Sequence, residues 1–496
     1  MTRHETAFAA LGQPLAAAPQ SQRAIDPAEQ ARLLAEVNDL RKKYADMVRA
    51  IQNTQSSGLT VPSHRYATRD RLKRALDAAI AAYVAYAGEH PPGGTGTEAK
   101  PTPAPSVGVM IADRAALDAA LASAKGGELF RLAAGHYGSI EIKPNFAVPV
   151  TLQSDGSATF GSIKLLRWHW QHRGKGFVLD GLKAGYIGVN TVDAVRIRRC
   201  DAEQVVIESA NDVVVERCWL HDGQFPLRIL RAYRFKVTGN ILERAREDTM
   251  RISGDSRFGE VRGNAFFDNR AAKPMHGDHL QIFGLPNESS CPQDMTIEQN
   301  LFHDWAADGK EVFHTRDGDP KKKETFKAGG RGTPAPAQGI FVGDGIGDFE
   351  RFSIRHNLMR LSMVNAIYIK SGKADYLVSE NIVLPIQGQT MARIRLPQFP
   401  RQPNWNLKGV KVTRCVAFMI EKETPEGEVL PDNFTFGSSV DGLFAGISDA
   451  DGNGGREPEH YRLAPKSRVP AGLVDSWLEA TITVLRATLN EVRRGS

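Results

Sequence analysis

The residues of this chain best suited to chemistry lie on short strands in which polar and apolar side chains alternate. In the segments LRIL, MRIS, LQIF and IYIK, the Leu, Met and Ile side chains should face one way, because alternate residues of a strand point to opposite sides. This pattern predicts an outward polar column that consists of Arg228, Arg251, Gln281 and Tyr368. Two residues from this column, the same segments add Lys370 on one side and His279 on the other. Such a stripe would reach successive units of a polymer.

The densest run of titratable residues is HGDHLQ, residues 276–281. Its His276, Asp278 and His279 could supply an acid and a base or bind a metal, although a histidine beside an aspartate is often only a hydrogen-bonded pair. Metal binding is the weaker interpretation, because no further ligand stands at a diagnostic spacing. Glycoside hydrolysis would need two carboxylates at a defined separation, and the sequence does not place any two of its candidates, Asp222, Asp248, Asp278 and Asp344.

Two insertions have the composition of binding loops. Residues 318–332 are basic, and residues 392–406 interleave arginines with aromatic residues, namely Arg393, Arg395, Phe399, Arg401 and Trp405. Arginine binds carboxylates in a bidentate way, and aromatic rings stack on sugar faces. The same composition would suit a nucleic acid, so these loops alone leave both ligands open.

An internal repeat must position these residues. Eight short alternating segments, among them VRIRRC, VVVERC and FKVTGN, end in Asn or Cys, at Cys200, Cys218, Asn240, Asn264, Asn300, Asn357, Asn381 and Cys415. The gaps between them, mostly short but sometimes long, predict stacked coils with loops inserted at the corners. We expect the Asn residues to adopt left-handed backbone angles and to form a hydrogen-bonded ladder. A small buried Cys can replace Asn there, without any disulfide.

The opening LDAALASAKGGELFRLAAGHYGSIEI, the Asn ladder and the closing YRLAPKS with PAG resemble the pectate-lyase-like superfamily. That superfamily includes polysaccharide lyases, some glycoside hydrolases and phage tailspikes. The resemblance covers about residues 107–470 and implies an all-β domain, a right-handed parallel β-helix. This context favours an acidic polysaccharide over a nucleic acid as the partner of the two insertions.

The segment EDTMRISGDS, residues 247–256, is similar to the Arg-bearing strand of alginate and chondroitin lyases of this superfamily. By that resemblance, Arg251 would face the substrate, and a lyase would need a basic residue to abstract the C5 proton. Lys370 is the candidate base, and Arg251 or Arg228 would neutralise the uronate carboxylate. Many such lyases carry an acidic calcium cluster, but here Glu247 and Asp248 are the only nearby pair. We therefore expect no cofactor and no metal.

Outside the β-helix, the sequence predicts a helical region over residues 1–87, a Pro/Gly-rich linker over 88–106 and a terminal helix over 471–496. Residues 27–55 follow a heptad pattern, which suits a coiled coil or a helix docked on its own chain equally well. The terminal helix repeats the pattern and either packs on the β-helix or associates with symmetry mates. Two heptad stretches flanking a β-helix favour a homotrimer.

The composition and net charge of the chain favour some classes of partner over others. The chain has 496 residues, a net charge of +6 and a pI near 9.0, which mildly favours an acidic partner. Four cysteines are too few for a disulfide framework in a chain of this size. No run of 18 apolar residues predicts a membrane span. The first 20 residues faintly resemble a signal peptide, but Gln13 and Pro14 interrupt the apolar run, so we do not expect export by this route.

Two functions fit these features. The first is a spike or fibre on a virion or a gene-transfer-agent particle that binds, with or without degrading, acidic capsular polysaccharide of the host or recipient cell. Its N-terminal region would attach to a structural protein of the particle, and lysis would release it without a signal peptide. The second is a free, secreted lyase that cleaves a uronate-containing glycan by β-elimination. We favour the first; if the chain is an enzyme, a lyase fits better than a glycoside hydrolase.

Overall fold

The structure is a computed structural model. It describes residues 108–167, 173–271, 277–286, 288, 290–303, 312–314, 323–325, 337–344, 348–361, 363, 365–386, 392–398, 406–450 and 454–495, with single residues between Glu29 and Ala75. Contacts divide the chain into two compact units, Met1–Pro105 and Ser106–Ser496. In the first unit, the described heptad positions Leu33, Leu40 and Met47 are helical. The rest of that heptad pattern and the predicted linker lie outside the described residues.

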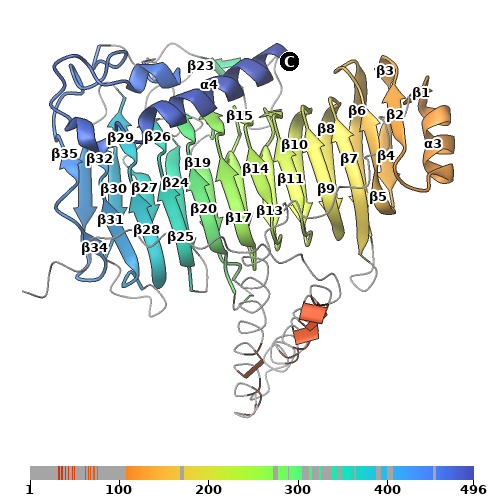
Figure 1. Cartoon of the computed structure of the whole chain (residues 1–496), viewed down its shortest axis with the longest axis horizontal. Coiled ribbons are helices and arrows are strands. Elements are labelled where there is room, and N and C mark those ends of the chain that lie inside the picture. Colours follow the sequence, from red (N-terminus) through yellow and green to blue (C-terminus); the bar gives the residue numbers. More distant parts are fainter. Residues whose placement is uncertain are drawn as a thin grey trace, which may run out of the picture. The chain divides into compact units, whose positions relative to one another are not determined.

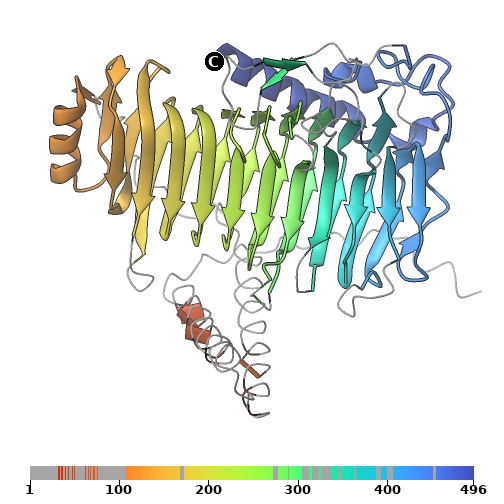
Figure 2. The same cartoon turned by 180° about the vertical axis from the view of Figure 1, so that it is seen from behind.

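The second unit is a stack of coils whose strands form long parallel sheets (Figures 1 and 2). One of them, sheet A, contains β1 (Val109–Ile111), β2 (Leu129–Leu132), β5 (Asn145–Gln153), β7 (Gly174–Asp180), β9 (Val192–Arg198), β11 (Val213–Glu216), β14 (Lys236–Thr238), β17 (Arg257–Arg262), β20 (Gln293–Glu298), β25 (Glu350–Arg355), β28 (Ala374–Ser379), β31 (Val410–Thr413) and β34 (Glu428–Val429). Each strand pairs in parallel with the equivalent strand of the next coil, which confirms the predicted parallel β-helix.

The second sheet begins as single strands and then divides into two rows. It opens with β3 (Gly135–His136), β4 (Ser139–Ile142), β6 (Ala158–Leu166), β8 (Lys183–Asn190) and β10 (Asp201–Glu208). Face B1 continues it with β12 (Trp219–His221), β15 (Ile241–Glu243), β18 (Ala265–Phe267), β21 (Leu301–His303), β26 (Leu358–Leu361), β29 (Ile382–Pro385), β32 (Val416–Ala417) and β35 (Phe434–Thr435). Face B2 consists of β13 (Leu227–Leu230), β16 (Met250–Ser253), β19 (Asp278–Phe283), β24 (Gln338–Asp344), β27 (Asn365–Ile369), β30 (Arg393–Leu396) and β33 (Met419–Lys422).

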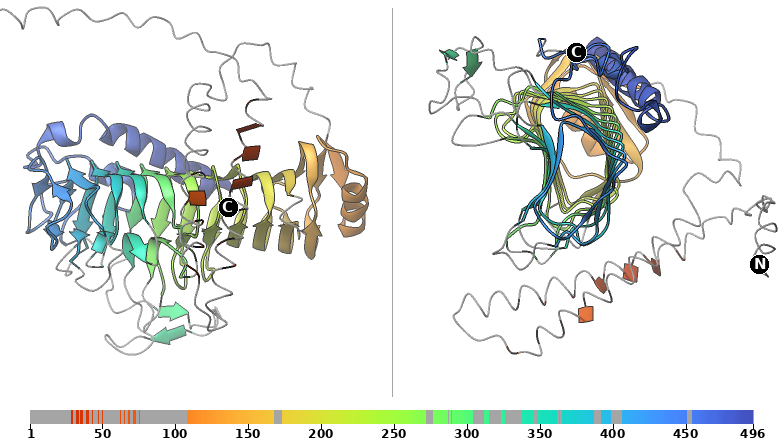
Figure 3. Two further views of the ribbon diagram at one scale, coloured as in Figure 1. Left: turned by 90° about the horizontal axis from the view of Figure 1, so that it is seen from below. Right: turned by 90° about the vertical axis from the view of Figure 1, so that its left-hand side faces the viewer.

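Viewed along the stack, each coil runs from sheet A through face B1 to face B2 around one apolar interior (Figure 3, right). Helix α3 (Arg114–Ser123) covers the first coil and buries Leu117. Its start is capped by the Asp113 carboxylate, which accepts a 2.9 Å hydrogen bond from the Ala116 amide. A short antiparallel pair, β22 (Val312–His314) and β23 (Lys323–Thr325), lies in the insertion after β21.

The predicted Asn ladder runs along the corner between sheet A and face B1. The Cys218 amide donates to Asn240 Oδ1 at 2.9 Å, and equivalent bonds continue from coil to coil. The ladder ends on Asn433, which accepts from the Cys415 amide at 2.9 Å and was missed in the sequence. All four cysteines are buried and free, as predicted for the three in the ladder.

The prediction that the ladder residues themselves are left-handed is wrong. The residue before each of them has positive φ, for example Arg217 at 55°, Gly239 at 66° and His356 at 58°. That residue makes the bend with its side chain pointing outward. The following Asn or Cys can then point inward, where its side chain reaches backbone groups of the adjacent coils.

Helix α4 (Leu478–Gly495) lies along face B1, so the terminal heptad packs on its own β-helix (Figure 1). Its apolar residues are buried with those of face B1, and Thr488 Oγ1 donates to the Gly263 carbonyl at 2.7 Å. This packing removes the terminal helix as an argument for a trimer. The last coil strand, β35, ends at Thr435 rather than near residue 470. An irregular segment with 3-10 helices η1 (Pro458–Tyr461) and η2 (Ala471–Leu473) follows before α4.

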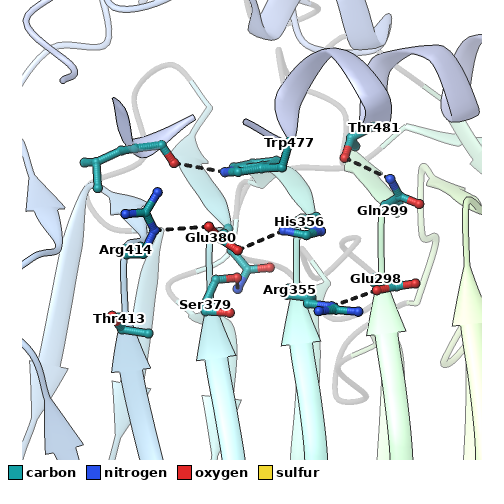
Figure 4. Close-up of polar contacts among 12 residues, drawn as sticks. Glu298, Gln299, Arg355, His356, Ser379, Glu380, Thr413, Arg414, Trp477 and Thr481 are labelled. Atoms are coloured by element: carbon teal, nitrogen blue, oxygen red, sulfur yellow. Dashed lines mark hydrogen bonds and ion pairs between the residues drawn. The ribbon is translucent and has the colours of Figure 1, made fainter. Parts of the chain in front are cut away.

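Side chains at the ladder corner hold the start of α4 (Figure 4). The Trp477 ring stacks on the His356 ring with centroids 5.0 Å apart. Glu380 joins His356 Nε2 at 2.9 Å and Arg414 Nε at 3.0 Å. Because these contacts link three coils to the helix, α4 is part of the folded β-helix. Neither α3, α4 nor any other described helix combines the length and apolarity needed to cross a membrane.

Candidate functional site

Face B2 carries the outward column predicted from the sequence. Arg228, Arg251 and Gln281 occupy matching positions on three successive coils. The next coil places Phe341 in the column, and Tyr368 follows on the coil after it. We missed Phe341, although QGIFVGD shows the same alternation, with Ile340 and Val342 buried.

At one end of this column, two arginines enclose an aromatic ring. The Arg251 guanidinium carbon lies 3.9 Å from the centroid of Phe225, and that of Arg228 lies 5.5 Å from it. The centroid of the Phe283 ring lies 5.9 Å from the same Arg251 carbon. The electron-rich ring face attracts both cations. Phe225 therefore holds two guanidinium groups on adjacent coils side by side.

At the other end, cations lie over two further rings. Phe341 and Tyr368 meet edge to face, with centroids 5.4 Å apart. Lys370 Nζ lies 4.7 Å from the Phe341 centroid, and the Arg395 guanidinium lies 5.4 Å from the Tyr368 centroid. We call the whole set the face B2 stripe; it comprises Phe225, Arg228, Arg251, Gln281, Phe283, Phe341, Tyr368, Lys370, Arg393 and Arg395.

Several cations of the stripe also have carboxylate partners. Lys370 Nζ lies 2.8 Å from Asp344 Oδ1. Arg395 pairs with Glu423 at 2.8 Å and with Glu421 at 3.2 Å. The same Glu421 also pairs with the guanidinium of Arg393.

Arg251 and Arg228, at the Phe225 end of the stripe, differ from each other in their carboxylate partners. Arg251 pairs with Asp248 and lies 3.6 Å from Glu247. Among the described residues, no carboxylate lies within ion-pair distance of Arg228. Arg228 is thus the stripe cation whose charge is least compensated.

A polar ladder lies beside the stripe, with one residue on each of five successive coils. It consists of the buried residues Asp248, Asp278, Gln338 and Asn365 and the partly buried Arg393. Arg393 Nε donates to Asn365 Oδ1 at 3.2 Å, Asn365 Nδ2 to Gln338 Oε1 at 2.8 Å, and Gln338 Nε2 to Asp278 Oδ1 at 2.9 Å. Because a guanidinium can only donate, Arg393 orients both amides. The ladder thus holds Arg393 at one end and, through Asp248, Arg251 at the other.

Two residues predicted to be catalytic lie in the interior instead. His279 is 0% exposed, with its ring edge-on to Phe266 and Phe302, and burial lowers its pKa to about 3. The prediction that His279 faces outward is wrong. Buried and partly exposed residues alternate only from Leu280 onward, because the strand begins just after a corner of the coil, and Asp278, His279 and Leu280 are all buried. Asp278 is also fully buried. Burial and then the neighbouring charge of Asp248 raise its pKa well above the usual range, and its Oδ1 accepts a hydrogen bond from Gln338 Nε2.

The carboxylates considered for hydrolysis are spread over different surroundings. Asp222 belongs to face B1, where it bonds His221 at 2.7 Å and Arg244 at 2.7 Å. Asp248 and Asp278 occupy adjacent coils but are both buried, whereas Asp344 is paired with Lys370. Among the described residues, no group of three or more His, Cys, Asp or Glu side chains could hold a metal.

Lys370 and Arg251, the predicted base and carboxylate neutraliser, lie on the same face but not on the same coil. Three coil steps separate them, or about 14 Å at a strand spacing of about 4.8 Å. The structure therefore places them beside different units of a bound polymer. His276, Phe399, Arg401, Trp405 and most of the basic insertion 318–332 lie outside the described residues.

No family model and no curated protein matches the chain. Among solved structures, it is similar to pectate lyase Pel9A, with 11% identity and a TM-score of 0.40 over 71% of this chain and 84% of that chain. It is also similar to PfbA, a surface adhesin of Streptococcus pneumoniae, with 11% identity and a TM-score of 0.37 over 66% and 89%. ORF18 of Geobacillus virus E2 has 9% identity and a TM-score of 0.31 over 66% and 60%. These similarities concern the fold alone.

Proposed function

We propose that this chain binds an acidic polysaccharide along the face B2 stripe, as the β-helix of a spike or fibre carried on a virion or related particle. The observation that carries the proposal is the run of cations and aromatic rings over six successive coils, from Arg228 to Arg395. The partly exposed guanidinium groups of Arg228, Arg251 and Arg395 match carboxylates, and the partly exposed Phe283 ring offers an apolar surface to a sugar. A repeating surface of this kind suits a repeating polymer.

The proposed location on a particle rests on the division of the chain into two units. Residues 1–105 form a compact unit separate from the β-helix unit. A separate N-terminal unit suits attachment to a structural protein of a particle, while the β-helix contacts the surface polysaccharide of a host or recipient cell. Protein that lacks residues 1–105 should then no longer co-sediment with purified particles. Undiminished co-sedimentation would contradict this part of the proposal.

Cleavage by β-elimination is the second candidate. Its base would be Lys370, whose Nζ lies over Phe341 and Tyr368 on the stripe where the glycan is proposed to bind. Two features favour binding over cleavage. Lys370 Nζ lies 2.8 Å from Asp344 Oδ1, and this contact would have to break before Lys370 could reach a sugar proton. In addition, Arg251 lies too far along the stripe to neutralise the carboxylate of the same sugar.

The test is size-exclusion chromatography of the full-length protein with acidic capsular polysaccharides. We expect intact polysaccharide to co-elute with the protein and to be lost when Arg228 and Arg251 are both changed to Gln. Shortened chains with ultraviolet absorbance from an unsaturated product would identify a lyase instead. Shortened chains without that absorbance would indicate hydrolysis, and no co-elution with any acidic glycan would contradict the proposed function.

A further inference from the structure

The outward column of face B2 continues past Arg228 toward the N-terminal end of the β-helix. Val206, Gly188 and Lys164 follow Arg228 in register on three successive coils. We propose a further subsite here, in which the Tyr186 hydroxyl and Arg228 hold one acidic sugar and Lys164 contacts the next. This inference rests on the proposed function and adds residues to the same binding surface.

The Tyr186 side chain lies along its strand instead of standing away from the sheet. A methyl group added at Gly188, two residues further along β8, would lie 2.7 Å from Tyr186 Cε1 and 3.0 Å from its Oη. The end of the phenol therefore fills the space that a side chain at position 188 would occupy, which only glycine leaves open. Gly188 is buried, whereas Tyr186 is partly exposed. The Tyr186 hydroxyl thus takes the place of a column residue on this coil.

Three polar groups in this part of the column have no partner among the described residues. No such residue forms a hydrogen bond with the Tyr186 hydroxyl, and no carboxylate lies within ion-pair distance of Lys164 or Arg228. Lys164 is exposed and Arg228 is partly exposed. Burial raises the pKa of Tyr186, and the charge of Arg228 opposes that shift, so these two side chains lie close enough to interact. A ligand can therefore bond to both without displacing a partner.

Two acids border this part of the column, and each contacts another cation. Glu141 lies 3.8 Å from Lys143, and Glu208 lies 3.4 Å from Arg231. These cations reduce the repulsion that the two acids would exert on a sugar carboxylate. The Arg228 guanidinium has five N–H donors, and no described acid accepts from them. Arg228 is therefore the group that binds the carboxylate of the sugar.

The spacing along the column suits one sugar between the Tyr186 hydroxyl and Arg228. The strands of Gly188 and Arg228 are two coil steps apart, which is about 10 Å at about 4.8 Å per coil. The coil between them carries Val206, a small apolar side chain that is partly exposed. A sugar above Val206 can share a hydroxyl with Tyr186 on one side and present its carboxylate to Arg228 on the other. Lys164, one coil beyond Gly188, then meets the next sugar.

The experiment is affinity electrophoresis of the full-length protein in three acidic polysaccharides: polygalacturonate, hyaluronan and polysialic acid. Tyr186→Phe removes only the hydroxyl, so it should weaken binding of the retarding glycan about threefold to tenfold, the range for one hydrogen bond. Gly188→Ala should weaken binding at least as much, because the added methyl group displaces the phenol. Lys164→Gln should also weaken binding. Lys175→Gln, at an exposed lysine of sheet A, is its matched control and should change binding less than about twofold.

Other outcomes separate this inference from the proposed function. If Tyr186→Phe and Gly188→Ala both bind within about twofold of the unchanged protein while Arg228→Gln binds more weakly, the subsite is wrong and polysaccharide binding stands. Equal losses in Lys164→Gln and Lys175→Gln would contradict a direct contact between Lys164 and a sugar. If none of the three polysaccharides retards the protein, the proposed function is contradicted together with the inference.

Discussion

The outer surface of sheet A and face B2 are built from the same coils but differ in the side chains that surround their cations. On sheet A, cations meet carboxylates of the adjacent coil, as in Lys236–Glu260 at 3.0 Å and Arg198–Asp180 at 2.9 Å. On face B2, most cations also have carboxylate partners, but Arg228 and Arg251 lie over the Phe225 ring as well, and no described carboxylate lies within ion-pair distance of Arg228. A column of alternating charges neutralises itself, whereas cations over rings keep donors available for a ligand. The difference points to face B2 as the binding surface.

The largest effect should come from removing the charges of Arg228 and Arg251 on face B2. Arg228→Gln with Arg251→Gln should weaken binding of acidic polysaccharide by at least about 100-fold, because each lost charged hydrogen bond costs about 1.5–3 kcal/mol. Affinity electrophoresis measures this change. The matched pair on sheet A, Arg196→Gln with Lys236→Gln, should change binding less than twofold. Equal losses in both double variants would remove the distinction between the two surfaces.

Removing the shared ring should have the next largest effect. In Phe225→Leu, both arginines lose a cation–π contact worth about 0.5–2 kcal/mol, so affinity for the acidic glycan should fall roughly threefold to thirtyfold. Phe258→Leu, at a partly exposed ring on sheet A, serves as the control. Unchanged affinity in Phe225→Leu would show that the ring does not position the guanidinium groups.

Two histidines in different surroundings should make the stability of the protein depend on pH in opposite directions. Burial depresses the pKa of His279 from 6.5 to about 3, so its contribution to stability is complete above pH 6.5 and is lost as pH falls toward 3. At His221, burial alone would lower the pKa, but hydrogen bonds to Asp201 and Asp222 outweigh it and raise the pKa to about 9. Its contribution is complete below pH 6.5 and is lost as pH rises through 9.

Chemical denaturation across pH separates the two histidines. His279→Leu should reduce the loss of unfolding free energy between pH 6.5 and 3, whereas His221→Gln should reduce the loss between pH 6.5 and 9. If His279→Leu leaves the acid limb of the profile unchanged, His279 is not the buried neutral group that titrates on unfolding.

The smallest effect should follow from breaking one pair on sheet A. Glu260→Gln removes the partner of Lys236, whose side chain is 60% exposed, and exposed pairs contribute about 0–1 kcal/mol. Thermal or urea unfolding should therefore shift only slightly, and glycan binding should not change. A loss above about 2 kcal/mol would mean that the sheet A columns stabilise the coils more than exposed pairs normally do.

Much of the fold and part of the site could be predicted from the sequence. The ladder positions, the buried cysteines and the shared column of Arg228, Arg251 and Gln281 were all predicted correctly. His279 and Asp278 were placed wrongly, because alternation along a strand holds only until the chain turns a corner. Phe341 was missed because a long insertion precedes its strand and hid the coil to which it belongs.

The sequence by itself determined which residues share a column, because in a stacked coil each strand has the equivalent strand of the next coil as its neighbour. Strand alternation and repeat spacing are local properties, so they predict that arrangement without long-range information. Only the tertiary structure decided how deeply each side chain is buried and which residues it contacts. Burial of His279, pairing of Lys370 with Asp344 and the docking of α4 on face B1 depend on how corners, insertions and the C-terminal segment pack. Those contacts join residues far apart in the chain, and no local pattern encodes them.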